Sequence, residues 1–352
     1  PRNAERYAAW AEALKAAINR VFWLDDVQRY SSLTSDDEQP IALHQFDLLG
    51  TALAVVCGVA PPERAALALA HYPHAPFGAP VISPQQPGVA VYHNRALWPF
   101  VTAYALRAAV VTRQSAVAAR AFESLFRGAA LNLSNMENLE WLTAKPRFDD
   151  GPVINSRRQL WSVAAYLSMV VESVFGITLR AGSLRIAPFL TTAARRAVGD
   201  GPQAKLTGLR LWGCTISVTL FLPPASAEPG FHPLSGVLLN GKPIATPLPL
   251  AAQGAGPLDL ELRFGPVHAG DLRLTETPAV DPLDRHAPAA FAPAAPTMQR
   301  VERLPEGTHL NWAMPTGSLA QGLRFRVYRN GLCVADDLVA CSWLDPHLAA
   351  FG

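Results

Sequence analysis

Residues 136–167 read MENLEWLTAKPRFDDGPVINSRRQLWSVAAYL, and the interpretation of the first half of the chain depends on this stretch. It combines two glutamates, Glu137 and Glu140, with a run of turn-forming residues and an almost uncharged helix that begins near Arg157. A carboxylate just upstream of so apolar a helix can cap and solvate a turn, or it can do chemistry at the mouth of a pocket. The neighbouring segments bear on this choice.

About six helices are predicted upstream of residue 177 from the helical spacing of apolar side chains. Proline suits the first turn of a helix, and Pro62 and Pro99 lie where two of these helices begin. Gly128 and Gly176 are expected to end two others. The predicted helices cover residues 4–20, 48–57, 63–71, 98–111, 115–128 and 157–176.

The loops between these helices alternate between long and short. Long loops precede the helices that begin near Asp47, Trp98 and Arg157, and short connections follow the first two of those helices. In a ring of helical hairpins, this alternation places every long loop at one end. The helices after the long loops are also the more apolar, so they are expected to form an inner layer. Residues 1–176 therefore predict half of a twelve-helix double ring, a partial (α/α)6 toroid, with a pocket at one end.

Strand patterns replace helical ones from about residue 177. Segments 208–223 and 258–264 alternate and contain β-branched residues, and an Asn240-Gly241 turn interrupts a third apolar segment. We interpret residues 177–280 as a β-sandwich beside the helices.

A Pro/Ala-rich linker is predicted at 281–298, semi-rigid and not expected to pack. Residues 299–352 alternate again and contain a second turn of the same type, Asn330-Gly331. We interpret them as a small fibronectin type III-like module. The fold class expected for the chain is thus multidomain α plus β.

The composition of the chain excludes several classes of protein. Half of the 352 residues are hydrophobic and 16% are charged, which indicates a globular chain of more than one domain. The net charge of +2 gives no electrostatic case for nucleic acid or an anionic membrane as a partner. No apolar run reaches the roughly 18 residues that a membrane span needs.

The four cysteines show no CxxC pair and no zinc-type spacing. The helix predicted over 48–57 is apolar on every side, so Cys57 is expected to be inert core, and Asp47 can cap the first turn of that helix. Cys333 and Cys341 could face each other across a hairpin, which leaves a disulfide between them open.

Four residues of the second long loop suit sugar binding. Tyr92, His93, Asn94 and Trp98 combine flat aromatic surfaces with hydrogen-bonding groups, and sugars stack C–H faces on rings while their hydroxyls take paired donors and acceptors. In the alternative interpretation, Asn94 caps the following helix, Trp98 is core and His93 bonds a backbone carbonyl.

The third long loop allows a structural role for Glu137. Ser134 and Glu137 fit a capping box, in which the glutamate reaches back to the Ser134 amide. Ser156 and Gln159 fit the same pattern at the next helix. A carboxylate held above an aromatic-lined ring would also suit general base catalysis, since it can deprotonate a water.

At these residues the chain resembles the six-hairpin glycosidases, which include glycoside hydrolase families 15 (glucoamylase-like), 37 and 63 and debranching-type glucosidases. YHNRALWPFVTAY is similar to the segment before an inner helix in several of them, and RRQLWSVAAYL is similar to their final inner helix. MENLEWLTA resembles the E-N-Y-N-P-x-T-G stretch of family 63, whose glutamate is the general base.

The resemblance, which covers about residues 4–176, places the general base at Glu137, with Asn138 and Thr143 also matching. The debranching-type pattern would select Glu140 instead. Two positions depart from the family: Arg95 and Ala144 stand where the relatives have glycine. The substrate-binding residues expected on this basis are Tyr92, His93, Asn94, Trp98, Gln159 and Trp161.

The implied reaction is inverting hydrolysis of α-glycosidic bonds in an oligo- or polysaccharide. Glu137 would activate water while an acid, about 6.5–9.5 Å from it, protonates the leaving oxygen. This chemistry needs no metal or organic cofactor. Counting helices back from residue 157 makes 4–20 the seventh of twelve, so the acid is expected upstream of Pro1 and the chain looks like the C-terminal half of a catalytic domain with its β domains.

Two other functions remain open at this stage. A phosphorylase on the same ring would use phosphate in place of the activated water, and a non-catalytic carbohydrate-binding protein would use Glu137 only as a cap. A linker and a fibronectin-like module suit a periplasmic or secreted protein. The oligomeric state is not predicted.

Overall fold

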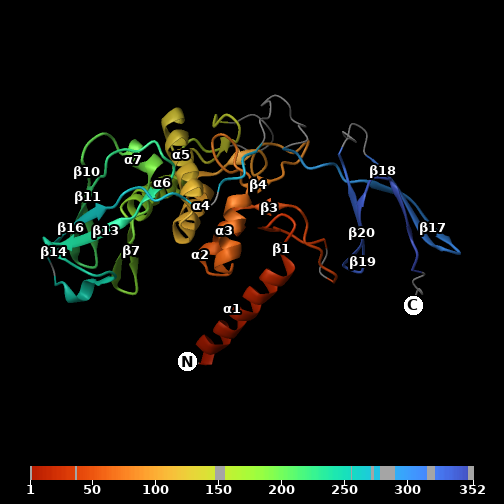
Figure 1. Ribbon diagram of the computed structural model, residues 1–352, viewed down its shortest axis with the longest axis horizontal. Helices are drawn as coiled ribbons and strands as arrows, with labels where there is room; N and C mark the ends of the chain where they lie inside the picture. Colours follow the sequence, from red (N-terminus) through yellow and green to blue (C-terminus); the bar gives the residue numbers. More distant parts are fainter. Residues whose placement is uncertain are drawn as a thin grey trace.

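The computed structural model describes residues 2–35, 38–146, 155–254, 256–270, 273–277, 290–314 and 322–347. Within them the protein is a mixed α plus β molecule with seven α-helices and several small sheets. The helices lie in the middle of an elongated molecule, with the largest sheet at one end and the C-terminal strands at the other (Figure 1). The first helix projects from the body and carries the N-terminus (Figure 1).

The predicted helices are present, and α4 lies at their centre. It contacts α2, α3, α5 and α6. A short π-helix, η1, continues α6. The helices are α1 (Arg2–Val21), α2 (Leu48–Val56), α3 (Pro62–His71), α4 (Pro99–Thr112), α5 (Ser115–Asn132), α6 (Leu160–Ser168), η1 (Met169–Val174) and α7 (Thr192–Ala197).

The predicted end of α5 at Gly128 is wrong, because the helix continues to Asn132 and closes on Leu133 at φ 47°. A Cβ at position 128 would lie 2.7 Å from Leu139 Cδ1, so the glycine lets the following loop approach the helix. Gly176, by contrast, ends the α6–η1 segment as predicted and has φ 70°.

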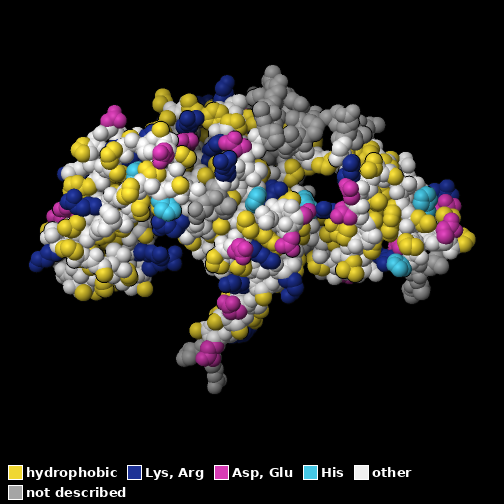
Figure 2. Space-filling view, in the orientation of Figure 1, with side chains coloured by type: hydrophobic (Ala, Val, Ile, Leu, Met, Phe, Trp, Pro, Cys, Tyr) yellow, Lys and Arg dark blue, Asp and Glu magenta, His cyan; other side chains and the backbone are white. Residues whose placement is uncertain are grey.

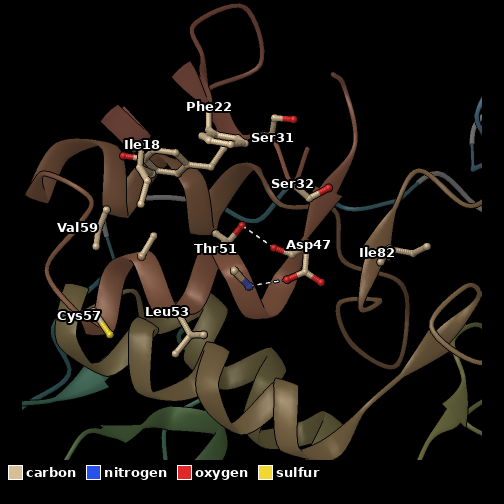
Figure 3. Close-up of a pocket in the computed structure, with 13 residues that line it drawn as sticks. Ile18, Phe22, Ser31, Ser32, Asp47, Thr51, Leu53, Cys57, Val59 and Ile82 are labelled. Carbon is tan, nitrogen blue, oxygen red and sulfur yellow. Dashed lines mark hydrogen bonds between the residues drawn. The ribbon is translucent and has the colours of Figure 1, made fainter. Parts of the chain in front are cut away.

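α2 is not buried on all sides as predicted. One face is buried, but Leu53 on the other is 37% exposed, and Cys57 is an exposed free thiol rather than core. This second face lines a cavity of about 630 Å³ between α1 and α2 (Figure 3). Asp47 caps α2 as predicted, since its side chain accepts a hydrogen bond from the Gly50 amide.

The predicted strands after residue 177 form two sheets. The first has the order β10-β11-β16-β13-β14, with β11 and β16 parallel and the other pairs antiparallel, and the second has the order β15-β8-β7. The Asn240-Gly241 turn joins β13 to β14 with both residues at positive φ, as predicted. The strands are β7 (Ile177–Arg180), β8 (Ser183–Ile186), β10 (Gln203–Leu211), β11 (Cys214–Phe221), β13 (Leu234–Leu239), β14 (Lys242–Pro243), β15 (Leu248–Pro249) and β16 (Pro257–Phe264).

Two-residue strands tie the long loops to one another. β3 pairs with β4, which joins the first long loop to the second, and β5 pairs with β6, which joins the second to the third. The short strands are β1 (Trp23–Leu24), β2 (Arg29–Tyr30), β3 (Phe46–Asp47), β4 (Ile82–Ser83), β5 (Ala96–Leu97), β6 (Leu139–Glu140), β9 (Leu190–Thr191) and β12 (Phe231–His232).

Two small sheets follow at the C-terminal end. One has the order β17-β18-β21 and the other is the hairpin β19-β20, whose turn is the predicted Asn330-Gly331. Trp312 packs edge-on against Phe325 across them, with 5.2 Å between ring centroids. The strands are β17 (Thr297–Leu304), β18 (Gly307–Ala313), β19 (Phe325–Arg329), β20 (Leu332–Leu338) and β21 (Ser342–Asp345). Cys333 and Cys341 are free thiols.

The end of the predicted linker packs, contrary to expectation. Ala290 and Phe291 are buried against Trp141, and the backbone N–H of Gln85 donates to the Ala290 carbonyl at 2.9 Å. Hydrogen bonds to a loop of the helical region therefore hold this segment in place. Residues 281–289 of the linker lie outside the described residues.

No helix in the described part of the chain combines the length and the apolar character needed to cross a bilayer.

Candidate active site

Two loops hold the carboxylate of Glu137. Its Oε1 accepts a hydrogen bond from the Tyr92 hydroxyl at 3.1 Å, and its Oε2 accepts one from the Ser156 amide at 2.8 Å. The Glu137 amide in turn donates to the Ser156 carbonyl at 2.9 Å. The residue is 6% exposed, so its position is fixed by these contacts.

The hydroxyl of Tyr92 remains protonated in this arrangement. Burial raises the pKa of Tyr92, and the hydrogen bond and negative charge of Glu137 raise it further. The phenol is therefore a permanent donor to the carboxylate near neutral pH. Its hydrogen bond holds the Glu137 carboxylate beside the Tyr92 ring.

The capping boxes predicted for this loop do not form. Ser134 follows the end of α5, and its amide bonds to the Ala129 carbonyl instead of Glu137. The Ser156 hydroxyl donates to the Arg158 carbonyl, while Gln159 is the N-cap of α6 without a side-chain capping bond. Glu137 and Ser156 bond each other instead. They are close because the loop that contains both residues folds back to the start of α6.

Glu140 has a different role from Glu137. Its Oε2 accepts hydrogen bonds from the Leu142 amide at 3.2 Å and from the amide and hydroxyl of Thr143 at 2.8 and 2.6 Å. These donors lie two and three residues further along the chain, so the carboxylate organises its own turn. The geometry favours Glu137 over Glu140 as a catalytic candidate.

A cluster of aromatic rings adjoins Glu137. His93 stacks on Trp98 with 5.0 Å between centroids, and Phe100 stacks on Trp161 at 4.7 Å. Trp98 and Trp161 are 5.6 Å apart, and Tyr92 lies edge-on to Trp98 at 5.0 Å. The structure thus brings together four of the predicted substrate-binding residues, with Phe100 as a fifth ring that the sequence did not single out.

Solvent reaches this cluster through His93 and Trp161. Trp161 is 41% exposed and His93 is also exposed, whereas Trp98 is buried and its Nε1 donates to the Tyr92 carbonyl at 2.7 Å. Trp98 therefore supports the two exposed rings. These rings offer a flat apolar surface of the kind on which sugar rings stack.

Asn94 is a structural residue, which corrects both of its predicted roles. Its Oδ1 accepts a hydrogen bond from the backbone N–H of Gln86 at 2.8 Å. Its Nδ2 donates to the backbone carbonyls of Gln86 and Val89 at 3.0 and 2.9 Å. Both amide hydrogens are used and the side chain is 2% exposed, so it is not free for substrate. It also does not cap α4, whose N-cap is Trp98.

Asp47 is the N-cap of α2 and is partly buried. Burial raises the pKa of Asp47, while the Gly50 amide and the charge of His93 oppose that shift. Asp47, Trp98 and Gln159 are the N-caps of α2, α4 and α6. Each of these three helices follows a long loop.

No group of three or more His, Cys, Asp or Glu side chains suited to holding a metal ion occurs within the described ranges.

Comparison with models of known protein families finds none that matches this chain, and comparison with curated proteins finds no relative.

Proposed function

We propose that this chain carries part of the active site of an inverting α-glycosidase of the six-hairpin type, with Glu137 as the general base. The observation that carries the proposal is the position of the Glu137 carboxylate, held by the Tyr92 hydroxyl and the Ser156 amide beside the aromatic cluster. Each carboxylate oxygen accepts one hydrogen bond, and each can accept another from a water. In this proposal Glu137 takes a proton from that water as it attacks the anomeric carbon.

The exposed rings of His93 and Trp161 would bind the sugar next to Glu137. A general acid on the other side of the glycosidic bond protonates the leaving oxygen in this proposal, as the resemblance to the six-hairpin glycosidases implies.

The contacts among the helices support the finer fold assignment that accompanies this function. α4 contacts both α2 and α6, and these three helices each follow a long loop. They would form the inner layer of a half-ring, with α3 and α5 outside it. The same proposal includes the β-sandwich after residue 177 and the fibronectin-like pair of C-terminal sheets.

Backbone conformation gives independent support for the resemblance. Arg95 and Ala144, the two residues that replace glycines of the family pattern, have φ values of 56° and 53°. Left-handed backbone of this kind favours glycine. The loops therefore keep the conformation that the family's glycines suit, although the residues differ.

Glu137→Gln in the full-length protein tests the role of Glu137. We expect hydrolysis of aryl α-glycosides to fall by about 10²- to 10⁴-fold, because glutamine cannot accept the proton of the attacking water. Glycan binding should persist, since the aromatic cluster is unchanged. Glu63→Gln, an exposed change in the first turn of α3, is the matched control. Equal turnover by the Glu137 variant and the control would exclude Glu137 as the base.

A second candidate is a carbohydrate-binding protein without catalytic activity. The observation that favours it is that Glu137 is nearly fully buried and that both of its oxygens already accept hydrogen bonds. Its role would then be to hold the Tyr92 loop. Glycan binding that Trp161→Ala abolishes, together with no turnover by the full-length protein, would select this function.

A further inference from the structure

A second cavity, of about 330 Å³, lies where three distant parts of the chain meet. Its walls include Arg29 and His44 from the first long loop, Ser83 from β4, Trp141 after β6, and Thr277. Two pairings fix these walls: β3 with β4, and an isolated bridge between His74 and Glu276. None of the residues assigned to the Glu137 site lines this cavity.

Arg29 is a cation without a partner in this cavity. Its side chain makes no hydrogen bond or ion pair within the described residues, and its Nε is shielded from solvent with no acceptor. Its guanidinium lies over the Phe46 ring, 3.9 Å from the centroid. Burial lowers the pKa of Arg29, which is the expected consequence of removing a cation from water.

The nearby carboxylates are already paired with other cations. Asp26 Oδ2 lies 2.8 Å from His44 Nε2 and 3.2 Å from an Arg326 nitrogen. Glu276 accepts a hydrogen bond from Arg120 at 2.8 Å. A buried or partly buried charge without a hydrogen-bonded partner is costly, so an anionic ligand would be stabilised beside Arg29.

Polar groups that could bind such an anion also line the cavity. The Thr277 hydroxyl is shielded from solvent and has no partner, and Ser83 provides a second hydroxyl. Trp141 adds a flat apolar wall. The volume suits a small molecule and is at the lower end of ligand pockets in proteins.

We propose that this cavity is a binding site for a small oxyanion, either a phosphate or a carboxylate, with Arg29 as its principal ligand. The planar guanidinium presents paired N–H donors that match both groups. Thr277 donates a further hydrogen bond. The site is independent of the glycosidase proposal, because it shares no residue with it.

Calorimetric titration of the protein with inorganic phosphate, and separately with acetate, tests this site. Ionic strength is held constant with chloride as the balancing anion. We expect saturable binding of one or both anions. The anion that binds more tightly identifies the preferred group. Arg29→Gln should weaken binding by about tenfold or more, since a charge-assisted hydrogen bond is lost. Arg29→Lys should weaken it less, because the charge remains.

Two further variants keep the test decisive. Arg210→Gln makes the same change of charge on exposed β10, and we expect its affinity to stay within about twofold of the original. Thr277→Val removes a hydroxyl without touching Arg29 and should weaken binding severalfold. Absence of saturable binding of either anion, or equal binding by the Arg29→Gln and Arg210→Gln variants, would overturn the proposal.

Discussion

Glu137 and Glu140 are three residues apart and are both buried, yet their carboxylates have different partners. The partners of Glu137 are distant in the sequence, Tyr92 in the second long loop and Ser156 at the far end of the third, whereas those of Glu140 belong to its own turn. A carboxylate held by distant loops sits where those loops meet, and a pocket can form there. A carboxylate that bonds its own turn needs no pocket to explain it.

His74 provides a prediction at the residue scale. Burial lowers the pKa of His74 from its ordinary 6.5 to about 3, and the nearby Arg120 charge lowers it as well. Between these values the unfolded chain binds a proton that the folded chain does not. The stability from neutral His74 is therefore present above pH 6.5 and is lost as the pH falls toward 3.

Urea unfolding at pH 7 and pH 5 measures this effect. We expect His74 to contribute about 2 kcal/mol to the loss of unfolding free energy between those pH values. His74→Leu keeps the position filled with a side chain that does not titrate. The unfolding free energy of this variant should therefore fall by about 2 kcal/mol less between pH 7 and pH 5 than that of the original protein. His71→Leu, a nearby change on α3, should leave the original pH dependence. Indistinguishable pH dependence in the original protein and the His74 variant would contradict the prediction.

At the scale of elements, two glycines have different roles in α5 and in the α6–η1 segment. Gly128 lies inside α5 and admits the close approach of Leu139, whereas Gly176 ends the segment that begins with α6. Sequence alone treats both as stop signals. The difference is decided by what lies beside each residue.

Gly176→Ala is predicted to be strongly destabilising. A Cβ there would lie 2.0 Å from the Pro188 nitrogen and 2.4 Å from the Ala187 carbonyl carbon, so backbone would have to move. Gly58 is a matched control because its φ is 69° against 70° at Gly176, with no atom within 4 Å of the added Cβ.

Chemical denaturation of the two glycine variants separates strain from collision. Gly58→Ala should cost about 1 kcal/mol, the strain of left-handed backbone alone. Gly176→Ala should cost about 3 kcal/mol or more, since backbone displacement is added to the same strain. Equal losses would mean that the segment after η1 does not pack against residue 176 as described.

At the scale of the whole molecule, one ion-pair network connects the C-terminal hairpin to the first long loop. Arg326 binds Asp336 within its own hairpin at 2.8 Å and Asp26 of the loop at 3.2 Å. His44 binds the same Asp26 oxygen. Figure 2 shows acidic, basic and histidine side chains close together where the C-terminal strands meet the centre of the molecule.

Arg326→Gln is predicted to loosen this junction. The Asp26 and Arg326 side chains are 41% and 37% exposed, so solvent screens the pair and it contributes no more than about 1 kcal/mol. Small-angle X-ray scattering should show a larger radius of gyration for the variant, and the original protein should approach that value at high salt. Arg324→Gln, which breaks an ion pair with Asp337 inside the hairpin, should leave the radius unchanged. If the radius of gyration of the original protein does not change with salt, the Arg326–Asp26 ion pair does not hold the C-terminal hairpin against the first long loop.

Local patterns were sufficient for many elements of this protein. The sequence alone located the helices before residue 177 but not α7, and it located the Asp47 cap, the prolines that open α3 and α4, and the two Asn-Gly turns. Each depends on residues within one or two turns of chain, where side-chain spacing and backbone preference act directly. The catalytic role of Glu137 stays a prediction, since the resemblance and not the spacing supplied it.

Tertiary structure decided the features that depend on distant residues. The partners of Glu137 lie 45 and 19 residues away from it, so no local pattern could replace the expected capping box with them. The burial of Phe291 against Trp141 and the lack of a partner for Arg29 likewise depend on which loops meet. Sequence determines local geometry because its forces act over a few residues, whereas a site forms where loop pairing brings separate segments into contact.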